Sequence, residues 1–333
     1  SGGTGAGRAA RAWWTLGTIA LDYKLLSLRG LEEEDGAYWD ELQAVHERSA
    51  LRTRSLCERN GGLFVKAGQF VATMAAAPKA YVRELSKLQD AAPPVPWEAV
   101  RAQLRASLGG EPEELFAELD PEPVAAASLA VVHRGVSAAT GEEVAVKVQR
   151  PHLARQAAAD LSFFGRGCEL VRYLFPGFDF AFVVPEFEAR MARELDFEWE
   201  GRSCERAGRD FSLDARVAVP AVHWALTSRE VLTMEFVRGA KPDDPGAVRA
   251  EGVCPRAAAR AVADVFARMA TCLGYVHGDP HPGNLLVRRG PGGEPQVVLL
   301  DHGLYVELPE GVRSGLCRFW RALVLHDRGE LRE

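Results

Sequence analysis

The residues with the clearest chemical potential lie in two short segments toward the end of the chain. Residues 277–284 are His-Gly-Asp-Pro-His-Pro-Gly-Asn, and 301–303 are Asp-His-Gly after an apolar run. Asn284 follows Asp279 by five residues, and Asp301 follows Asn284 by seventeen. Phosphoryl transfer from Mg-ATP needs an aspartate that orients the attacking hydroxyl or water, and an asparagine and a second aspartate that hold Mg²⁺ on the phosphates. We predict Asp279 as catalytic residue, and Asn284 and Asp301 as metal ligands.

A lysine in a predicted strand supplies another part of such a site. Residues 143–149 alternate between apolar and polar side chains, as a half-buried strand does. Lys147 stands where the third strand of a kinase places the lysine that binds the α and β phosphates. It precedes Asp279 by 132 residues. A lone lysine on a strand is usually a solvated charge, but this position favours a catalytic and cofactor-binding role.

The segment before this strand carries small residues where a kinase has a glycine-rich loop. Alanine permits a fairly close approach of the backbone to phosphates but excludes most positive φ values, so the loop should be stiff. An alanine run alone would indicate helix or core. Its place before the lysine strand favours a nucleotide loop, whose cofactor-binding residues are Ala125, Ala126, Ala127 and Ser128.

Two further strands are predicted at residues 217–224 and 231–237, with 227–230 as the turn between them. The end of the second strand would form the hinge whose backbone contacts the adenine. Glu235 and Val237 therefore join the cofactor-binding set, and Met234 is the gatekeeper candidate.

Acidic residues gather in a predicted helix from Pro185 to Arg202. Glu194 and Glu198 share one face at i, i+4 spacing, and Asp196 and Glu200 share a neighbouring face. A kinase lysine pairs with a helical glutamate. We expect Glu194 to be that partner, with Glu200 as second choice; most acids on such a helix face solvent, and we expect one or two of these four to reach the site.

Several motifs together resemble the ABC1/UbiB family of atypical kinases, also called aarF-domain kinases. They are the alanine loop, Lys66-Ala67-Gly68-Gln69, Glu194-Leu195-Asp196, and the two segments at 277–284 and 301–303. Residues 194–202 and 301–305 resemble the animal aarF-domain kinase five subgroup most. The similarity runs from about Leu21 to the end of the chain.

The resemblance implies a protein-kinase-like α+β fold of two lobes with Mg-ATP between them. It also implies that Lys66 and Gln69, from K-x-G-Q, lie over the active site and pair with Glu194 and Asp196. These four are the expected regulatory residues. The family pattern is not fully kept: Val131 replaces a glutamine after the alanine loop, and His302 replaces the phenylalanine of D-F-G.

The expected domains follow the order of the sequence. Residues 1–118 form a helical extension with K-x-G-Q, 119–238 a kinase-like N-lobe with a helical insert at about 151–208, and 239–333 a partial C-lobe. The C-lobe is expected to be truncated because only 32 residues follow Asp301. A helix from Pro255 to Tyr275 places apolar residues at i, i+3, i+4 spacing on one inward face; a membrane-lying helix is the alternative. The inward residues are Val262, Val265, Phe266, Met269 and Leu273.

Composition limits the class of protein and its partners. The chain has 333 residues, 47% hydrophobic, which suffice for two lobes with their own cores. A net charge of −6 argues against nucleic acid as a partner. The six cysteines show no CxxC spacing and are expected to be reduced thiols, neither a zinc site nor a disulfide framework.

The sequence therefore predicts an atypical kinase or ATPase of the UbiB type with ATP and Mg²⁺ as cofactors. The resemblance implies a mitochondrial location and a link to lipid or quinone metabolism at a membrane surface. The acceptor is left open between a lipid-like small molecule, a protein and water. Two alternatives are a pseudokinase scaffold that binds nucleotide without turnover, and a small-molecule kinase of the choline or aminoglycoside type.

Overall fold

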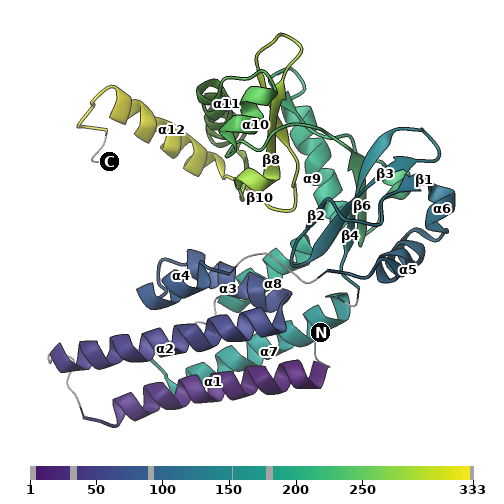
Figure 1. Cartoon of the computed structure of the whole chain (residues 1–333). Helices are drawn as coiled ribbons and strands as arrows, with labels where there is room; N and C mark the ends of the chain where they lie inside the picture. Colours follow the sequence, from purple (N-terminus) through teal and green to yellow (C-terminus); the bar gives the residue numbers. More distant parts are fainter. Residues whose placement is uncertain (1–4, 31–35, 89–93, 152, 178–182, 331–333) are drawn as a thin grey trace. The chain divides into compact units, whose positions relative to one another are not determined.

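The chain forms an α+β protein that divides into two compact units (Figure 1). The computed structural model describes residues 5–30, 36–88, 94–151, 153–177 and 183–330. The first unit comprises Ser1–Gln103, Pro121–His133 and Lys147–Leu195, and the second comprises Leu104–Asp120, Arg134–Val146 and Asp196–Glu333. The expected domains are contiguous in sequence, whereas each unit combines several segments. The domain boundaries stay a prediction.

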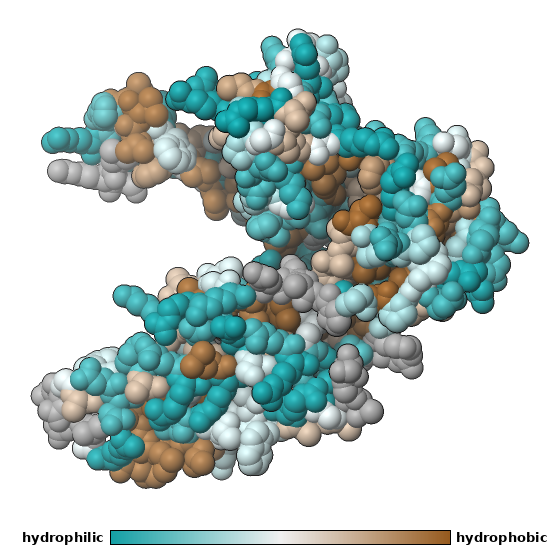
Figure 2. All heavy atoms as spheres, viewed as in Figure 1, coloured by the Kyte–Doolittle hydropathy of each residue, from teal (hydrophilic) through white to brown (hydrophobic). Residues whose placement is uncertain are grey.

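Helices make up most of the first unit. They are α1 (Gly5–Ser27), α2 (Gly36–Asn60), α3 (Leu63–Thr73), α4 (Lys79–Leu85), α7 (Leu153–Leu174) and α8 (Val183–Glu194). Helix α2 packs against α1, α3 and α4, and α7 packs against α1, α3 and α8. Of the helices in the expected insert, α7 and α8 therefore belong to the unit of the N-terminal helices. Figure 2 shows apolar side chains exposed along α1, at the lower edge of the view.

Two apolar clusters and one buried ion pair hold these helices together. The first cluster joins α1, α2, α3 and α4 through residues such as Ala12, Cys57 and Phe64. The second joins α3, α7 and α8 through residues such as Leu63 and Met191. Arg8 of α1 also donates a hydrogen bond to the Asp160 carboxylate of α7, with 2.5 Å between nitrogen and oxygen. Burial raises the pKa of Asp160, and the charge of Arg8 opposes that effect.

A five-stranded sheet has the order β1-β3-β4-β6, with β2 paired to β3. The strands are β1 (Phe116–Leu119), β2 (Ala125–Ala126), β3 (Ala130–Ser137), β4 (Glu143–Gln149) and β6 (Val231–Glu235). Helices α5 (Trp97–Leu108) and α6 (Pro112–Leu115) precede it. β1 and β2 both run antiparallel to β3. Val144, Val146 and Val148 are fully buried on β4, which confirms the strand predicted from alternation.

The single helix predicted over 185–202 is wrong. α8 ends at Glu194, and α9 (Phe197–Asp210) begins after a break. Asp196 adopts an extended conformation, and its carboxylate accepts hydrogen bonds from the backbone N–H groups of Glu198 and Trp199. An aspartate at this position satisfies N–H groups that have no partner inside the helix. It therefore starts a new helix instead of continuing the old one.

The strand pair predicted at 217–224 and 231–237 is confirmed only in part: the His223 N–H donates to the Thr233 carbonyl oxygen and the Glu235 N–H to the Ala221 carbonyl oxygen, but residues 217–218 pair elsewhere. β5 is only Val217–Ala218, and it runs parallel to β9 (Pro295–Leu299), a strand far along the chain. A 3₁₀ turn, η1 (Trp224–Leu226), interrupts the remainder. An isolated bridge between Val222 and Met234 connects this segment to β6.

The second unit continues with α10 (Pro245–Ala250), α11 (Pro255–Arg268), the π-helical turn η2 (Met269–Leu273), β7 (Tyr275–His277), the 3₁₀ turn η3 (Pro282–Asn284), β8 (Leu285–Arg289), β9, β10 (Tyr305–Glu307) and α12 (Glu310–Val324). β5, β9 and β8 form one sheet, and β7 pairs with β10 in another. No helix among the described residues has both the length and the apolar character that crossing a membrane requires.

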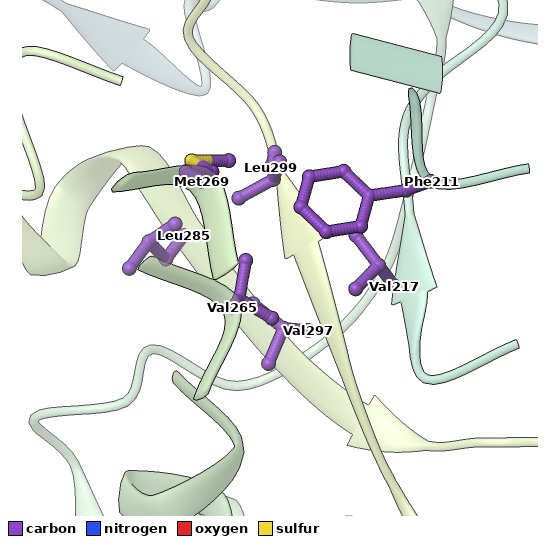
Figure 3. Packing of buried hydrophobic residues seen from close by; sticks show 7 residues of the cluster. All are labelled: Phe211, Val217, Val265, Met269, Leu285, Val297 and Leu299. Carbon is purple, nitrogen blue, oxygen red and sulfur yellow. The ribbon is translucent and has the colours of Figure 1, made fainter. Parts of the chain in front are cut away.

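The core of this unit lies between α11 and the sheet of β5, β9 and β8. Figure 3 shows its side chains pointing toward one another; they are Phe211, Val217, Val265, Met269, Leu285, Val297 and Leu299. Val262, Phe266 and Leu273 pack against this cluster, which confirms the inward face predicted for residues 255–275. The α-helix itself ends earlier, at Arg268, and Gly274 closes the π-helical turn with a φ of 68°. That left-handed conformation suits glycine.

We expect Gly68→Ala to destabilise the protein by about 1 kcal/mol, because overpacking of about 1–3 kcal/mol outweighs a gain of about 1 kcal/mol in helix propensity. A Cβ at Gly68 would overlap Leu88 Cδ1 and lie 3.1 Å from Cys57 Sγ. Urea unfolding of the full chain measures the change. Gly165→Ala, where nothing lies within 4 Å of the added Cβ, is the control and should stabilise. Equal stabilisation by both changes would contradict close packing at Gly68.

Candidate functional site

A buried histidine connects the segment of Asp279 to the segment of Asp301. The backbone N–H of Asp279 donates to His277 Nδ1 at 3.1 Å, so Nδ1 carries no proton. His277 Nε2 must then be the protonated nitrogen, and it donates to the Asp301 carbonyl oxygen at 2.6 Å. His277 is 2% exposed. A neutral imidazole of one fixed tautomer therefore sets the spacing between these two segments.

Hydrogen bonds join Asn284 to Asp279, the predicted catalytic residue. Its Nδ2 donates to the Asp279 carbonyl oxygen at 3.1 Å and to Asp279 Oδ2 at 3.3 Å. The backbone N–H of Leu300 donates to the Asn284 carbonyl oxygen at 3.0 Å, directly before Asp301. Because the NH₂ group of the amide faces Asp279, its oxygen faces the other way. Asn284 therefore fixes the Asp279 carboxylate, and its role as a metal ligand stays a prediction.

Hydrogen bonds from Asp301 and from His302 hold the segment of residues 301–303 in place. Asp301 Oδ1 accepts a hydrogen bond from the Gly303 N–H at 3.1 Å. His302 is fully buried; its Nε2 donates to the Leu299 carbonyl oxygen and its Nδ1 accepts from the Tyr305 hydroxyl, both at 3.0 Å. Burial raises the pKa of Tyr305, so this hydroxyl stays protonated. His302 stands where a kinase has the phenylalanine of D-F-G, and it fixes this segment through two hydrogen bonds.

The donor set formed by Asp279, Asn284 and Asp301 fits Mg²⁺. Carboxylate and amide oxygens are the ligands this cation prefers, and it commonly takes one or two carboxylates with substrate phosphates. His277 and His302 use both ring nitrogens inside the protein, so they suit a metal less. Within the described segments, no three or more His, Cys, Asp or Glu side chains group as a metal site. The set is therefore suited to a cation that arrives with a nucleotide.

Glu200 of α9 lies beside the Asp301 segment. It is 2% exposed, and its Oε1 accepts from the His302 N–H at 3.4 Å. Its Oε2 is 3.6 Å from where a Cβ of Gly303 would stand. Glu194, the first choice as the partner of the strand lysine, contacts Lys66 and Arg190, and its role toward Lys147 stays a prediction. That prediction assumes one continuous helix, and the break before α9 alters which acids share a face.

The structure brings together one of the two expected regulatory pairs. Lys66 Nζ lies 3.5 Å from Glu194 Oε2, and Arg190 Nε donates to Glu194 Oε1 at 3.2 Å. Gln69 donates to the Leu88 carbonyl oxygen at 3.2 Å. Asp196 caps α9. Lys66 and Glu194 thus form a half-buried pair between α3 and α8, and the regulatory roles of all four residues stay a prediction.

The alanine loop forms a tight hairpin ahead of the lysine strand. Ala125 pairs with Val132, and the Ala127 N–H donates to the Ala130 carbonyl oxygen at 2.8 Å. Arg150 Nε donates to the Ala127 carbonyl oxygen at 2.9 Å. Among the described non-glycine residues only His326 has a positive φ, so the loop keeps the backbone conformations expected of alanine. Ala126 is exposed, whereas the Ser128 hydroxyl is buried and has no hydrogen-bond partner in the described structure.

The predicted hinge follows β6. Met234 is buried, as a gatekeeper would be. The Glu235 N–H donates to the Ala221 carbonyl oxygen at 2.8 Å, and the Phe236 N–H donates to the Glu143 carbonyl oxygen at 3.1 Å. In the described part of the chain, no acceptor contacts the Val237 N–H. Of these hinge amides, the Val237 N–H is therefore the one available to an adenine.

Glu143, at the start of the lysine strand, is a residue that sequence reasoning missed. Its carboxylate accepts hydrogen bonds from Arg238, just after the hinge, and from Arg134 of β3. These two guanidinium groups lower the pKa of Glu143 to about 2. The signal available in the sequence was a charged residue at a strand end, which is too common to single out.

Comparisons with known proteins agree with this geometry. The family described as "ABC1 atypical kinase-like domain" matches residues 87–333. AarF domain-containing protein kinase 1 of Xenopus tropicalis is 37% identical over 330 residues, which cover 98% of this chain and 63% of that protein. Probable serine/threonine-protein kinase abkB of Dictyostelium discoideum is 34% identical over 313 residues, covering 93% of this chain and 47% of that protein. The chain thus spans less than two thirds of the length of these relatives.

A solved structure shows the same architecture. The complex of Rv3197 from Mycobacterium tuberculosis with erythromycin superposes with a TM-score of 0.61 at 28% sequence identity, covering 87% of this chain and 73% of that one. The Xenopus relative carries the designation kinase 1, whereas residues 194–202 and 301–305 suggested kinase five; the family does not depend on that choice. The expected protein-kinase-like α+β fold is confirmed. The chain belongs to the ABC1 family of atypical kinase-like proteins.

Proposed function

We propose that this protein binds Mg-ATP and transfers its γ-phosphoryl group to a small lipid-like acceptor, to a protein or to water. The observation that carries the proposal is the fixed arrangement of Asp279 and Asn284 beside the Asp301 segment. In this proposal Asn284 and Asp301 hold Mg²⁺, and Lys147 binds the phosphates. A mitochondrial location and a membrane-bound substrate belong to the same proposal, through the family.

Asp279 is proposed to orient the acceptor. The bond between the acceptor oxygen and the γ-phosphorus forms as the bond from that phosphorus to the bridging oxygen of ADP breaks. The acceptor proton passes to the Asp279 carboxylate, whose Oδ2 is held by Asn284. Bound Mg²⁺ would neutralise charge on the phosphates. An acceptor positioned in this way needs little other covalent help from the protein.

The Lys66–Glu194 pair supports hydrolysis or small-molecule chemistry over phosphorylation of peptides. In the family resemblance, the K-x-G-Q segment covers the place where a peptide would bind. Here Lys66 is tethered to Glu194, and Gly68 packs closely against Leu88 and Cys57. A segment anchored by both charge and packing is unsuited to moving aside for each turnover. We therefore place ATP hydrolysis and small acceptors first.

Asp279→Asn should lower Mg²⁺-dependent ATP turnover by about 10²–10⁴-fold while nucleotide affinity is kept, because the group that accepts the proton is lost.

Asp301→Asn should weaken Mg-ATP binding and abolish turnover, because a metal ligand is lost. Single-turnover phosphate release and nucleotide titration of the full-length protein measure the two effects. Asp264→Asn, at a half-exposed carboxylate paired with Arg216, is the control.

Three results would contradict parts of this proposal. Unchanged Mg-ATP affinity in Asp301→Asn would reject its role as metal ligand. Nucleotide binding without turnover in the unaltered full-length protein would favour the pseudokinase scaffold. Turnover that depends on an added amino alcohol or aminoglycoside would favour the small-molecule kinase alternative.

Lys66→Ala should raise self-phosphorylation, because the K-x-G-Q segment loses its charged tether to α8. Glu194→Gln should act in the same direction, since it removes the other partner. Incorporation of labelled phosphate into the full-length protein measures both changes. Lys87→Ala is the matched control, because it removes a lysine paired with Glu84 elsewhere in the first unit. Self-phosphorylation that stays at the unaltered level in both test variants would reject the regulatory role.

A further inference from the structure

The segment that follows β6 is attached to the second unit at two points. The Phe236 N–H donates to the carbonyl oxygen of Glu143, at the start of β4, with 3.1 Å between nitrogen and oxygen. A few residues later, Ala240 and Val287 of β8 exchange two backbone hydrogen bonds, with distances of 2.9 and 2.8 Å. Residues 237–239 thus form a short span between a strand of the first sheet and a strand of the second.

The Glu143 side chain holds a residue inside this span. Arg238 Nη1 donates to Glu143 Oε2 at 2.6 Å, and Nη2 donates to Oε1 at 2.8 Å, so the two groups meet as a fork that fixes direction as well as distance. Arg134 of β3 donates to the same carboxylate, with Nε 3.1 Å from Oε1. The guanidinium carbons of Arg238 and Arg134 lie 5.5 and 5.8 Å from the centroid of the Phe236 ring, within the range of cation–π attraction. One glutamate therefore holds both neighbours of Val237.

The fork has a local effect more than a global one. The Arg238 side chain is 66% exposed and that of Glu143 is 32% exposed. Ion pairs open to water contribute little to the free energy of folding, so the fork is not needed for the protein to fold. It does limit the backbone conformations of the residue between its two attachments. The Val237 N–H, which contacts no acceptor in the described part of the chain, therefore keeps one direction before a ligand arrives.

We propose that Glu143 is a positioning residue through which the nucleotide site selects adenine over guanine. The inference rests on the proposed function, in which the Val237 N–H contacts the base. The N1 atom of adenine accepts a hydrogen bond from such an N–H, whereas N1 of guanine carries a hydrogen and opposes it with a second donor. A fixed N–H therefore favours adenine and penalises guanine, while a mobile N–H turns away from guanine and discriminates less. Glu143 acts through Arg238 and Phe236, not by contact with the base.

The test is titration of the full-length protein with Mg-ATP, Mg-GTP and magnesium tripolyphosphate, before and after Glu143→Gln. This change removes the charge that holds Arg238 and keeps the backbone oxygen that holds Phe236. Affinity for Mg-ATP should fall about three- to tenfold, as expected for one weakened hydrogen bond, while affinity for Mg-GTP stays or rises. Affinity for tripolyphosphate, which has no base, should not change. Arg238→Lys should lose most of the same preference, because an ammonium keeps the charge but cannot form the fork.

Glu310→Gln is the matched control, because Arg313 binds Glu310 in a similar fork, with distances of 2.9 and 2.7 Å, on α12. It should leave all three affinities unchanged. Glu143→Gln combined with Arg238→Gln should lower the preference for ATP no further than Glu143→Gln alone, since both changes break one contact. An unchanged ATP-to-GTP ratio in Glu143→Gln, equal losses for both nucleotides, or additive losses in the double variant would overturn the positioning role alone. Absence of Mg-ATP binding in the unaltered protein would overturn the proposed function with it.

Discussion

The proposed catalytic residues depend on one buried imidazole. Asp279 lies at the end of β7 and Asp301 at the end of β9, and β7 and β9 belong to different sheets. Two carboxylates that share a cation repel each other before the cation arrives, so some other interaction must hold them in place. His277 does so without adding charge, since it accepts from one segment and donates to the other. The β7–β10 pairing and the His302 hydrogen bonds then fix the segment that follows.

The break between α8 and α9 assigns the acidic residues to different tasks. The boundary between the compact units falls between Leu195 and Asp196. Glu194, the last residue of α8, pairs with Lys66 in the first unit. Glu200, in α9, is buried against the His302 backbone in the second unit. Asp196 lies between them and caps α9. This structural role accounts for the aspartate without a regulatory one. One E-x-D motif thus serves an ion pair and a helix start.

Local patterns predicted much of this structure, and non-local pairing explains most of what they missed. Alternation predicted β4, and periodicity predicted the inward face of α11. The spacing of Asp279, Asn284 and Asp301 predicts a site, and the roles of these residues stay a prediction. The parallel pairing of β5 with β9 joins residues about eighty positions apart, which no local pattern encodes. The prediction of one helix over residues 185–202 failed for another reason. An aspartate within a helical pattern suits a solvent-exposed face as well as a helix cap, so the sequence did not reveal the break.

In the proposed function, phosphate binding depends on a cation. Asp279 and Asp301 are carboxylic side chains, so a polyphosphate would approach them only with a cation that reverses the local field. Asn284 adds no charge to this pair, and its Nδ2 holds the Asp279 carboxylate through Oδ2 at 3.3 Å. The proposed arrangement therefore makes nucleotide binding depend on Mg²⁺.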